Sequence, residues 1–221
     1  MAIEPGPLLA SGRAADVYDQ GDGTVLRRYR IDHGSEDEFR VMRWLAEQGV
    51  PVPAVHHADG RDLVMERVVG PTMLEDLQRR PWTLLRHAAT LARLQRDLAA
   101  VAAPDWLPTQ AGVPPGDALV HLDLHPMNVL LGPHGPVIID WTNASRGAAA
   151  FDAGYTYVLM STFEMSGLRD RVAQQVLVRT FAAYRGRGLV RELLAEACER
   201  KLADAHTTPG ERLATLRLAP G

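Results

Sequence analysis

Three oxygen-bearing side chains, Asp123, Asn128 and Asp140, flank a short apolar segment and could together hold a cation and handle a proton. Two apolar runs, 129–131 and 137–139, are separated by the turn residues 132–136, which predicts an antiparallel hairpin. We expect this hairpin to place Asn128 beside Asp140, about 5 Å apart. Amide and carboxylate oxygens suit a hard cation such as Mg²⁺, which leaves Asp123 for the proton. The pattern points to phosphoryl transfer.

The bulk properties indicate an ordinary globular protein of one large domain or two small lobes. The chain has 221 residues, of which 46% are hydrophobic and 23% charged. A net charge of −3 without a basic block argues against nucleic acid as a partner. The single cysteine, Cys198, excludes an internal disulfide, fits a reducing compartment and is interpreted as a packing residue. No signal peptide and no apolar stretch of bilayer length are visible, so we expect a cytoplasmic protein without a membrane partner; the oligomeric state is left open.

The first third of the chain is predicted to be rich in strands, at 8–10, 16–18, 24–31, 55–58 and 63–66, with one helix from Ser35 to about 48. Alternation in the strand 24–31 places Arg27 on its more apolar face. Glu38 lies on the apolar stripe of the helix. Buried charges need partners, so we predict an Arg27–Glu38 ion pair. A snorkelling arginine and a surface pair elsewhere are the alternatives.

The rest of the chain is predicted to be mainly helical after a break near 66–71. Helices are expected at 72–78, 83–103, 152–166, 169–185 and 189–205, with a Pro/Gly-rich loop at 104–116 and the hairpin described above. The predicted fold class is therefore α+β. Its predicted domains are an N-terminal lobe, 1–68, and a helical C-terminal lobe, 69–221, that carries the hairpin.

The motif His121-x-Asp123-Leu124-His125-Pro126-x-Asn128, followed by Ile139-Asp140-Trp141, closely resembles that of the aminoglycoside phosphotransferase family. These enzymes are relatives of the protein kinases that phosphorylate small molecules. The full pattern is far more specific than a lone H-x-D, and the order of parts agrees over nearly the whole chain. The resemblance implies a bilobal protein-kinase-like fold: an N-terminal antiparallel sheet with one helix, and a helical lobe with a catalytic hairpin.

The resemblance also implies residue roles. Asp123 corresponds to the catalytic base that orients and deprotonates the acceptor hydroxyl, and Asn128 and Asp140 to the ligands of Mg²⁺ on the phosphates of ATP. Arg27 falls at the position of the phosphate-binding lysine, and Glu38 at that of its helix partner. The remaining positions that the resemblance assigns to the nucleotide are Ser11 and Gly12 in the phosphate loop, Val17 and Val25 around adenine, and Met65, Glu66 and Val68 in the hinge.

The sequence departs from the family pattern at four places. Arg27 replaces lysine, and only Gly12 is kept of the loop glycines, with Ala10 and Ala15 at the others. Leu122 and Met127 replace glycines and are expected to crowd the catalytic loop. Three further residues have two interpretations each. His121 either holds the loop or carries protons, and His125 is either structural or contacts the phosphate or a metal-bound water. Asp152 either braces the catalytic loop or caps a helix N-terminus.

The predicted function is ATP- and Mg²⁺-dependent transfer of the γ-phosphate to a hydroxyl of a small molecule, either an aminoglycoside-like antibiotic or a hydroxylated metabolite. A nucleotide-binding, pseudokinase-like module is the alternative, and metal-dependent phosphate-ester hydrolysis is a third hypothesis that lacks a second metal site. Glutamates at 192, 196 and 199 form a predicted helical stripe that could receive a polyamine or simply be solvated. The candidate acceptor residues are Trp106, Trp141, Tyr155, Tyr157, Glu164, Glu192, Glu196 and Glu199.

Overall fold

The computed structural model describes residues 3–12, 14–31 and 35–220, and its contacts group the chain into two compact units. The first unit comprises Met1–Pro71 and Val129–Thr142, and the second comprises Thr72–Asn128 and Asn143–Gly221. The hairpin thus packs with the strand-rich unit, whereas the predicted lobes assigned it to the helical part. The division into a nucleotide-binding lobe, 1–68, and a lobe with the catalytic loop and substrate site, 69–221, stays a prediction.

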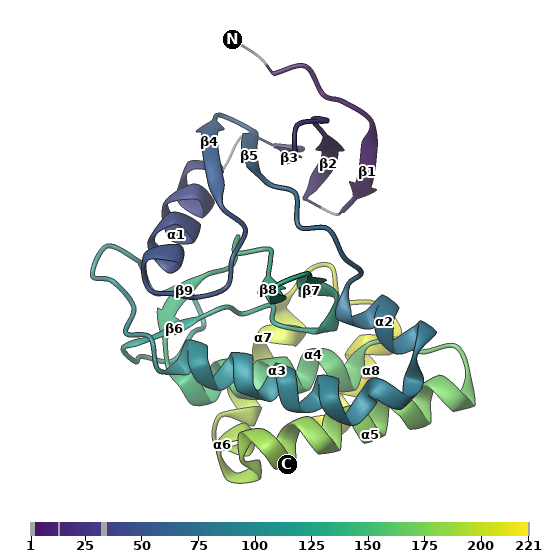
Figure 1. The fold of residues 1–221 in the computed structure, drawn as a ribbon. Helices are drawn as coiled ribbons and strands as arrows, with labels where there is room; N and C mark the ends of the chain where they lie inside the picture. Colours follow the sequence, from purple (N-terminus) through teal and green to yellow (C-terminus); the bar gives the residue numbers. More distant parts are fainter. Residues whose placement is uncertain (1–2, 13, 32–34, 221) are drawn as a thin grey trace. The chain divides into compact units, whose positions relative to one another are not determined.

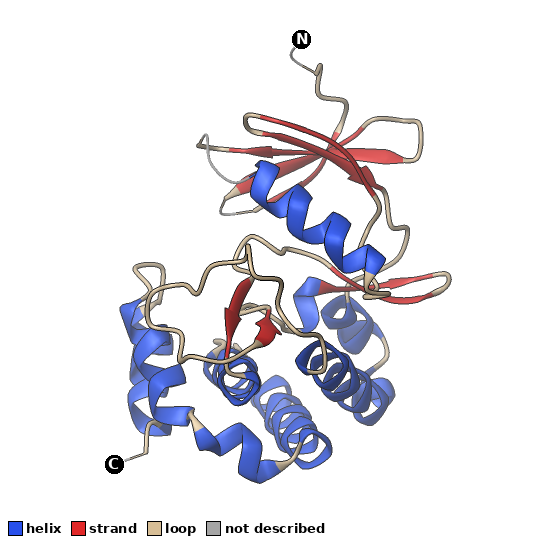
Figure 2. Ribbon diagram, turned by 90° about the vertical axis from the view of Figure 1, so that its left-hand side faces the viewer, coloured by secondary structure: helices blue, strands red, loops and turns tan. Residues whose placement is uncertain are grey.

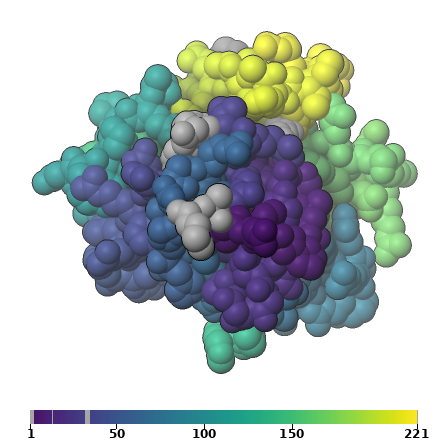
Figure 3. All heavy atoms as spheres, turned by 90° about the horizontal axis from the view of Figure 1, so that it is seen from above, coloured from purple at the N-terminus to yellow at the C-terminus, as the bar shows by residue number. Residues whose placement is uncertain are grey.

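The first unit is built on a five-stranded antiparallel sheet with the strand order β1-β2-β3-β5-β4 (Figure 1). One helix, α1, lies along this sheet (Figure 2). The edge strand β1 is exposed along its whole length, and the purple N-terminal segment lies at the surface in Figure 3. The predicted antiparallel sheet with one helix is confirmed. The elements are β1 (Leu8–Ser11), β2 (Ala15–Asp19), β3 (Thr24–Tyr29), α1 (Ser35–Glu47), β4 (Val55–Asp59) and β5 (Asp62–Glu66).

Helix α1 is held to the sheet by its apolar stripe. Val41, Met42 and Leu45 are buried, as their i, i+1 and i+4 spacing predicts for one helix face. The Ser35 hydroxyl, expected to cap the helix, donates instead to the carbonyl oxygen of Gly60 at 2.6 Å. Glu38 lies on the same buried face, so this helix carries one carboxylate into the interior of the unit.

The hairpin consists of β7 (Val129–Gly132) and β8 (Gly135–Ile138). Its register pairs Val129 with Ile138 and Gly132 with Gly135, so only two residues form the turn. The predicted five-residue turn would have paired Val129 with Ile139 and set Asn128 opposite Asp140. The tighter turn shifts the register by one residue, so that expected pairing was wrong.

The second unit is mainly helical, as predicted, but differs in detail. Helix α3 ends at Ala99 rather than 103, and the stretch predicted as one helix from 189 to 205 is two helices that meet at Leu193. The short β6–β9 pair and the last helix were not predicted. The elements are α2 (Met73–Arg79), η1 (Pro81–Thr83), α3 (Leu84–Ala99), β6 (Ala118–Val120), η2 (Pro126–Asn128), β9 (Ser145–Gly147), α4 (Ala149–Thr162), α5 (Leu168–Arg185), α6 (Arg187–Glu192), α7 (Leu194–Ala203) and α8 (Pro209–Leu218).

Helix α4 forms the centre of the second unit and is buried on almost every side. Phe151 and Tyr155 stack with ring centroids 6.1 Å apart, in a core that also contains Leu122 and Cys198. Cys198 is 1% exposed, so its predicted packing role is confirmed. Nearby, Lys201 on α7 and Glu211 on α8 form a buried ion pair, with Nζ and Oε2 3.2 Å apart, that joins the last two helices.

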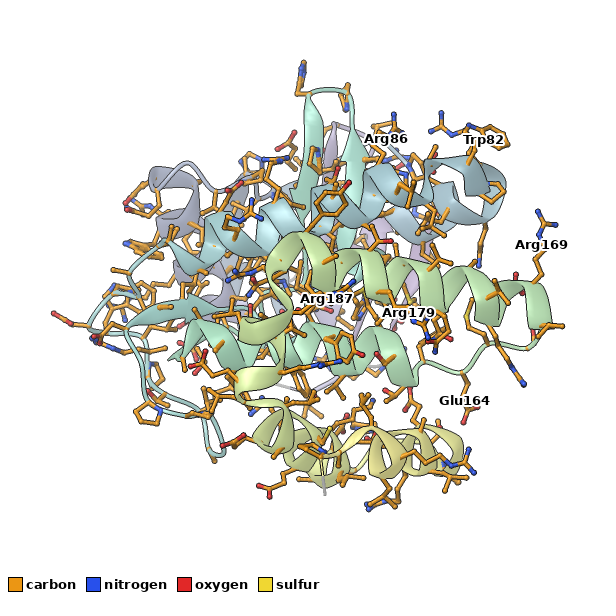
Figure 4. The ribbon with its side chains drawn as sticks, turned by 90° about the horizontal axis from the view of Figure 1, so that it is seen from below. Trp82, Arg86, Glu164, Arg169, Arg179 and Arg187 are labelled. Atoms are coloured by element: carbon orange, nitrogen blue, oxygen red, sulfur yellow. The ribbon has the colours of Figure 1, made fainter. Side chains whose placement is uncertain are left out.

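The outer side of α5 is exposed and carries both apolar and basic side chains. Leu168 and Val172 are 80% and 55% exposed. Figure 4 shows Arg169 and Arg179 reaching outward from this helix, and Trp82 doing so from η1. Within the described residues, no helix combines the length and apolar character that crossing a bilayer requires.

Candidate active site

The loop that carries Asp123 is held from behind by one buried carboxylate. Asp152, in the first turn of α4, accepts the Leu122 N–H at Oδ1 (2.8 Å) and the Gln95 amide at Oδ2 (3.3 Å). Leu122 has a φ of 62°, which is costly for a branched side chain, so the loop needs this anchor. The predicted bracing role of Asp152 is confirmed, whereas its N-cap alternative is wrong because Ala148 is the N-cap.

The Asp123 carboxylate is oriented by an amide and an imidazole. Asn128 Nδ2 donates to Asp123 Oδ2 at 3.0 Å and to the Asp123 carbonyl oxygen at 2.9 Å. His125 Nε2 lies 3.3 Å from Oδ1. The Asp123 side chain keeps 29% of its surface exposed. A carboxylate that is fixed in direction yet accessible, with no Lys or Arg ion pair among the described residues, is suited to accept a proton from a ligand.

The two histidines of the motif hold the loop through backbone contacts. His121 is fully buried, and its Nδ1 accepts the Asp123 N–H at 3.2 Å. His125 Nδ1 accepts the Met127 N–H at 3.3 Å, so the proton of a neutral ring lies on Nε2 and faces Asp123. Met127 is 45% exposed and Leu122 is buried in the core, and the expected crowding of the catalytic loop by these two residues stays a prediction.

The first unit contains a buried charge cluster centred on Arg27, which is 8% exposed. Its Nη1 lies 3.1 Å from Glu38 Oε1, so the predicted ion pair is confirmed. Its Nη2 lies 2.7 Å from Asp140 Oδ1 and donates to the Thr142 hydroxyl at 3.2 Å. Burial opposes the charge on Arg27, but the attraction of Glu38 and Asp140 outweighs it and raises the pKa of the guanidinium. Arg27 therefore stays charged at every accessible pH.

Glu38 collects further donors in the same cluster. The Trp141 N–H donates to Oε1 at 2.9 Å, and the Tyr29 hydroxyl donates to Oε2. Burial raises the pKa of Glu38 against the opposing effect of Arg27. Tyr29 lies two residues after Arg27 and therefore on the same face of β3. This spacing indicates Tyr29 as a site residue, although it was not predicted as one. Trp141 is 1% exposed, so it does not line an open surface as an acceptor residue would.

Asp140 differs from Glu38 because it is partly open. Its side chain is 36% exposed, its φ is 65°, and its Oδ1 accepts the Thr142 hydroxyl at 2.9 Å. Asp140 and the Asn128 amide oxygen are hard oxygen donors, as Mg²⁺ prefers. The described part of the chain contains no group of three or more His, Cys, Asp or Glu that could hold a metal. Each of these side chains by itself offers the kind of oxygen that Mg²⁺ takes when one or two protein ligands hold it beside substrate phosphates and water.

Four of the residues expected at the nucleotide, Val17, Val25, Arg27 and Met65, share one face of the sheet. The register pairs Val17 with Arg27 and Val25 with Met65, and Val25 and Arg27 are two residues apart on β3. In the hinge, the Glu66 N–H donates to the Ala54 carbonyl, whereas Val68 N–H makes no backbone hydrogen bond to any described residue. At the predicted hinge, Val68 thus has a backbone N–H without a backbone partner among the described residues.

The predicted phosphate loop is tied down by an exposed arginine. Arg30 Nη2 donates to the Ser11 hydroxyl (2.9 Å), to the Gly12 carbonyl (3.0 Å) and to Asp16 Oδ1 (2.7 Å). The Gly12 N–H donates to the Ala15 carbonyl at 2.9 Å and so points within the loop. Arg13, also expected to offer its amide to phosphate, lies outside the described residues. Phosphate binding by this loop stays a prediction.

The acceptor-side candidates do not form the expected acidic stripe. Glu192 belongs to α6 while Glu196 and Glu199 belong to α7, because the helix breaks at Leu193. Glu164 accepts the Thr208 hydroxyl at 2.8 Å and is exposed. Trp106 and Tyr157 are both half-buried.

Tyr155, whose pKa is raised in part by Asp123, is instead contacted by a residue that was not predicted, Arg200, which in turn contacts a second one, Gln110. Arg200 lies over the Tyr155 ring, 5.6 Å from its centroid, and donates to Gln110 Oε1 at 2.8 Å. No local pattern singles out either residue, because their contact joins positions 90 apart in the sequence.

Comparison with known proteins decides the family. The family model of the phosphotransferase enzyme family, APH, matches residues 6–112 and 70–193. The chain belongs to this family. It is accordingly a small-molecule phosphotransferase that transfers to a hydroxyl group. A search of curated proteins found no match.

Solved structures of APH-type enzymes share its protein-kinase-like fold. The streptomycin–ATP complex of APH(2")-IIa is 13% identical, with a TM-score of 0.65 over 98% of this chain and 91% of that one. APH(4)-Ia is 18% identical, with a TM-score of 0.65 over 97% and 94%. A choline/ethanolamine kinase family protein from Mesorhizobium loti is 19% identical, with a TM-score of 0.59 over 96% and 85%. At these identities the likeness concerns the fold.

Proposed function

We propose that this APH-family protein transfers the γ-phosphoryl group of ATP to a hydroxyl of a small molecule, with Asp123 as the catalytic base. The carrying observation is the Asp123 carboxylate, which is fixed by Asn128 and His125 and remains partly exposed. Aminoglycoside-like compounds and other hydroxylated metabolites are the candidate acceptors. A solved structure of similar fold contains both streptomycin and ATP, which supports ATP as the donor.

In the first unit, the shared sheet face supplies the proposed nucleotide contacts. Val17, Val25 and Met65 provide an apolar surface for adenine, and the Val68 N–H, next to Glu66 in the hinge, provides a hydrogen-bond donor. Arg27 provides the cation for phosphate oxygens, with Glu38 fixing its direction at 3.1 Å. The loop at Ser11 and Gly12 is proposed to cover the phosphates.

In the second unit, Asp123 is proposed to orient the acceptor hydroxyl and accept its proton as the oxygen attacks phosphorus. Asn128 holds one oxygen of Asp123 through Nδ2, which leaves Oδ1 of the amide for a cation. Asn128 and Asp140 are the proposed Mg²⁺ ligands. When bound, the ion would neutralise phosphate charge that otherwise repels the attacking oxygen.

The test compares two substitutions in purified protein with ATP and GTP as donors. Asp123→Asn should abolish transfer, by about 1,000-fold or more, and leave nucleotide affinity nearly unchanged. Asp140→Ala should remove Mg²⁺-dependent nucleotide binding, measured by titration calorimetry with and without Mg²⁺. The acceptor screen covers aminoglycosides, macrolides, choline-like amines, sugars and nucleosides. Full activity of Asp123→Asn would exclude its assigned role, and unchanged Mg²⁺ dependence would remove Asp140 from the metal site.

A nucleotide-binding module without turnover is the second candidate. It is favoured by the phosphate loop, where the Gly12 N–H bonds to Ala15, and by Arg27, whose guanidinium is occupied by two carboxylates. Nucleotide binding without transfer to any member of the acceptor screen would support it. Asp123-dependent transfer to a single acceptor would exclude it.

A further inference from the structure

Arg200 is a cation whose contact with Tyr155 links it to the core cluster that also holds Leu122, the residue before Asp123. We propose, building on the proposed function, that Arg200 binds an anionic group of the acceptor, so that the preferred substrate is a hydroxylated small acid. Its anionic group would be a carboxylate or a phosphate monoester. Arg200 would then be a specificity-determining residue.

The position of Arg200 follows from the brace behind the catalytic loop. Asp152 on α4 binds the N–H of Leu122, the residue before Asp123. Tyr155 is one turn further along α4 and packs in the same core cluster as Leu122. Arg200 lies over the Tyr155 ring, 5.6 Å from its centroid. A short chain of contacts thus links this guanidinium to the loop that presents Asp123, all within the second unit.

Arg200 is fixed in place by neutral groups. Its Nη2 donates to Gln110 Oε1 at 2.8 Å, and its Nη1 donates to the Ala111 carbonyl oxygen at 3.2 Å. Gln110 is itself anchored, since its N–H donates to Ser145 Oγ at 2.9 Å and its Nε2 to the Asn143 carbonyl at 3.0 Å. The guanidinium is therefore pre-oriented, which lowers the entropic cost of binding a ligand.

The charge of Arg200 is not neutralised by this arrangement. Among the ion pairs of the described residues, none involves Arg200, whereas the buried Arg27 contacts two carboxylates. Glu196 lies one turn before Arg200 on α7 and Asp204 one turn after it at the C-cap, and neither forms an ion pair with Arg200 among the described residues; Asp204 Oδ1 accepts the His206 N–H. A half-buried, oriented and unpaired guanidinium is a typical binding group for carboxylate or phosphate oxygens.

Tyr155 adds a neutral ring beside this cation. Burial raises its pKa to about 12; Arg200 works against that effect, while Asp123 and Asp204 add to it. The hydroxyl therefore stays protonated at neutral pH, and because Tyr155 is only 6% exposed we assign its ring the support of the guanidinium rather than contact with the ligand. A proton-accepting carboxylate and an arginine together match a molecule with a hydroxyl near an anionic group.

The test uses pairs of ligands in which one member carries an acidic group that the other lacks. Calorimetry measures the affinity of the full chain for each ligand in the presence of a non-hydrolysable ATP analogue and Mg²⁺. Gluconate is compared with sorbitol, and glucuronate and glucose 6-phosphate are compared with glucose. Kanamycin is added as a polycation. The acids should bind more tightly than their neutral partners, and the comparison of glucuronate with glucose 6-phosphate shows which anion is preferred. Arg200→Gln should weaken acid binding by about 10- to 100-fold and leave the neutral ligands unaffected.

Two further variants separate charge from structure. Arg200→Lys should restore part of the acid preference, because it keeps the charge without the two-pronged geometry. Arg191→Gln, which removes an exposed arginine of α6, is the matched control and should change nothing. Equal weakening of acids and neutral ligands in Arg200→Gln, or tighter binding of kanamycin or of the neutral members, would overturn the proposal, as would the absence of acid binding altogether.

The same panel distinguishes this inference from the proposed function. Acid-selective binding that depends on Arg200, without Asp123-dependent transfer, would support the recognition site and contradict the phosphotransfer roles. Asp123-dependent transfer confined to neutral or cationic acceptors would support the phosphotransfer roles and contradict the recognition site.

Discussion

The two regions proposed to act in phosphoryl transfer hold their carboxylates in opposite ways. In the first unit, Glu38 and Asp140 are both bound by one buried guanidinium, Arg27. In the second unit, Asp123 is held by the amide of Asn128 and the ring of His125. The first arrangement pairs a buried cation with one buried and one partly open carboxylate, and the second orients a carboxylate that has no cationic Lys or Arg partner among the described residues.

This difference separates stability from chemistry. A buried carboxylate that loses its cation is strongly destabilising, because its desolvation is no longer offset. A partly exposed carboxylate held by an amide and an imidazole can be replaced by an isosteric amide at little cost to folding. Substitutions in the first unit should therefore act mainly on the free energy of unfolding, and those at Asp123 mainly on turnover.

The largest expected effect on stability is that of Arg27→Met. It leaves Glu38 buried without its cation and should lower the free energy of unfolding by about 3–5 kcal/mol. Denaturant titration of this variant beside Asp123→Asn measures the contrast directly, since the latter should stay within about 1 kcal/mol of the parent protein. Arg27→Lys is the charge-preserving control and should retain most of the stability. Equal losses of unfolding free energy in Arg27→Met and Asp123→Asn would contradict the expected difference between the two units.

A smaller effect is expected at the brace of the catalytic loop. Asp152→Ala leaves the Leu122 N–H and the Gln95 amide without their buried acceptor, which should cost about 2–3 kcal/mol. Hydrogen exchange at the Leu122 amide should accelerate in the native state, and Asp152→Asn should show a weaker change because it keeps one oxygen. An unchanged Leu122 exchange rate in Asp152→Ala would show that this carboxylate does not hold the loop.

The smallest effect is expected for Arg30→Ala, which frees the loop of Ser11 and Gly12. The Arg30 side chain is 48% exposed, so the loss of its pair with Asp16 should cost less than about 1 kcal/mol. The KM for ATP should nevertheless rise while kcat changes little. Because exposed pairs are screened, the difference from the parent protein should shrink in about 1 M salt. A stability difference that does not change with salt would show that the Arg30–Asp16 pair behaves like a buried ion pair.

Local periodicity was sufficient to predict the Arg27–Glu38 pair. Strand alternation placed Arg27 inward and helix spacing placed Glu38 on the apolar stripe, so each charge required a partner. The brace by Asp152 followed from the family resemblance. The roles assigned to the nucleotide, metal and acceptor residues remain predictions.

Other features depended on contacts that no local pattern specifies. The hairpin register was missed by one residue because the turn closes over two residues rather than five. The break at Leu193 occurs without glycine or proline, so the acidic stripe appeared continuous in the sequence. Helix α8 was not predicted, although the spacing of Thr208 and Glu211 indicates the capping box that begins this helix. The contact of the Trp141 N–H with Glu38 joins residues 103 apart and is purely tertiary.

The buried Lys201–Glu211 pair has a practical consequence for how this protein can be studied. Lys201 is the single lysine of the chain and is 4% exposed, and the proposed phosphate-binding cation is Arg27. Nucleotide probes that acylate a lysine amine in a kinase site would therefore find no reactive amine at that position. Activity-based profiling with such probes would not detect this enzyme even if it were fully active, so its occupancy must be followed by reversible binding or by phosphoryl transfer itself.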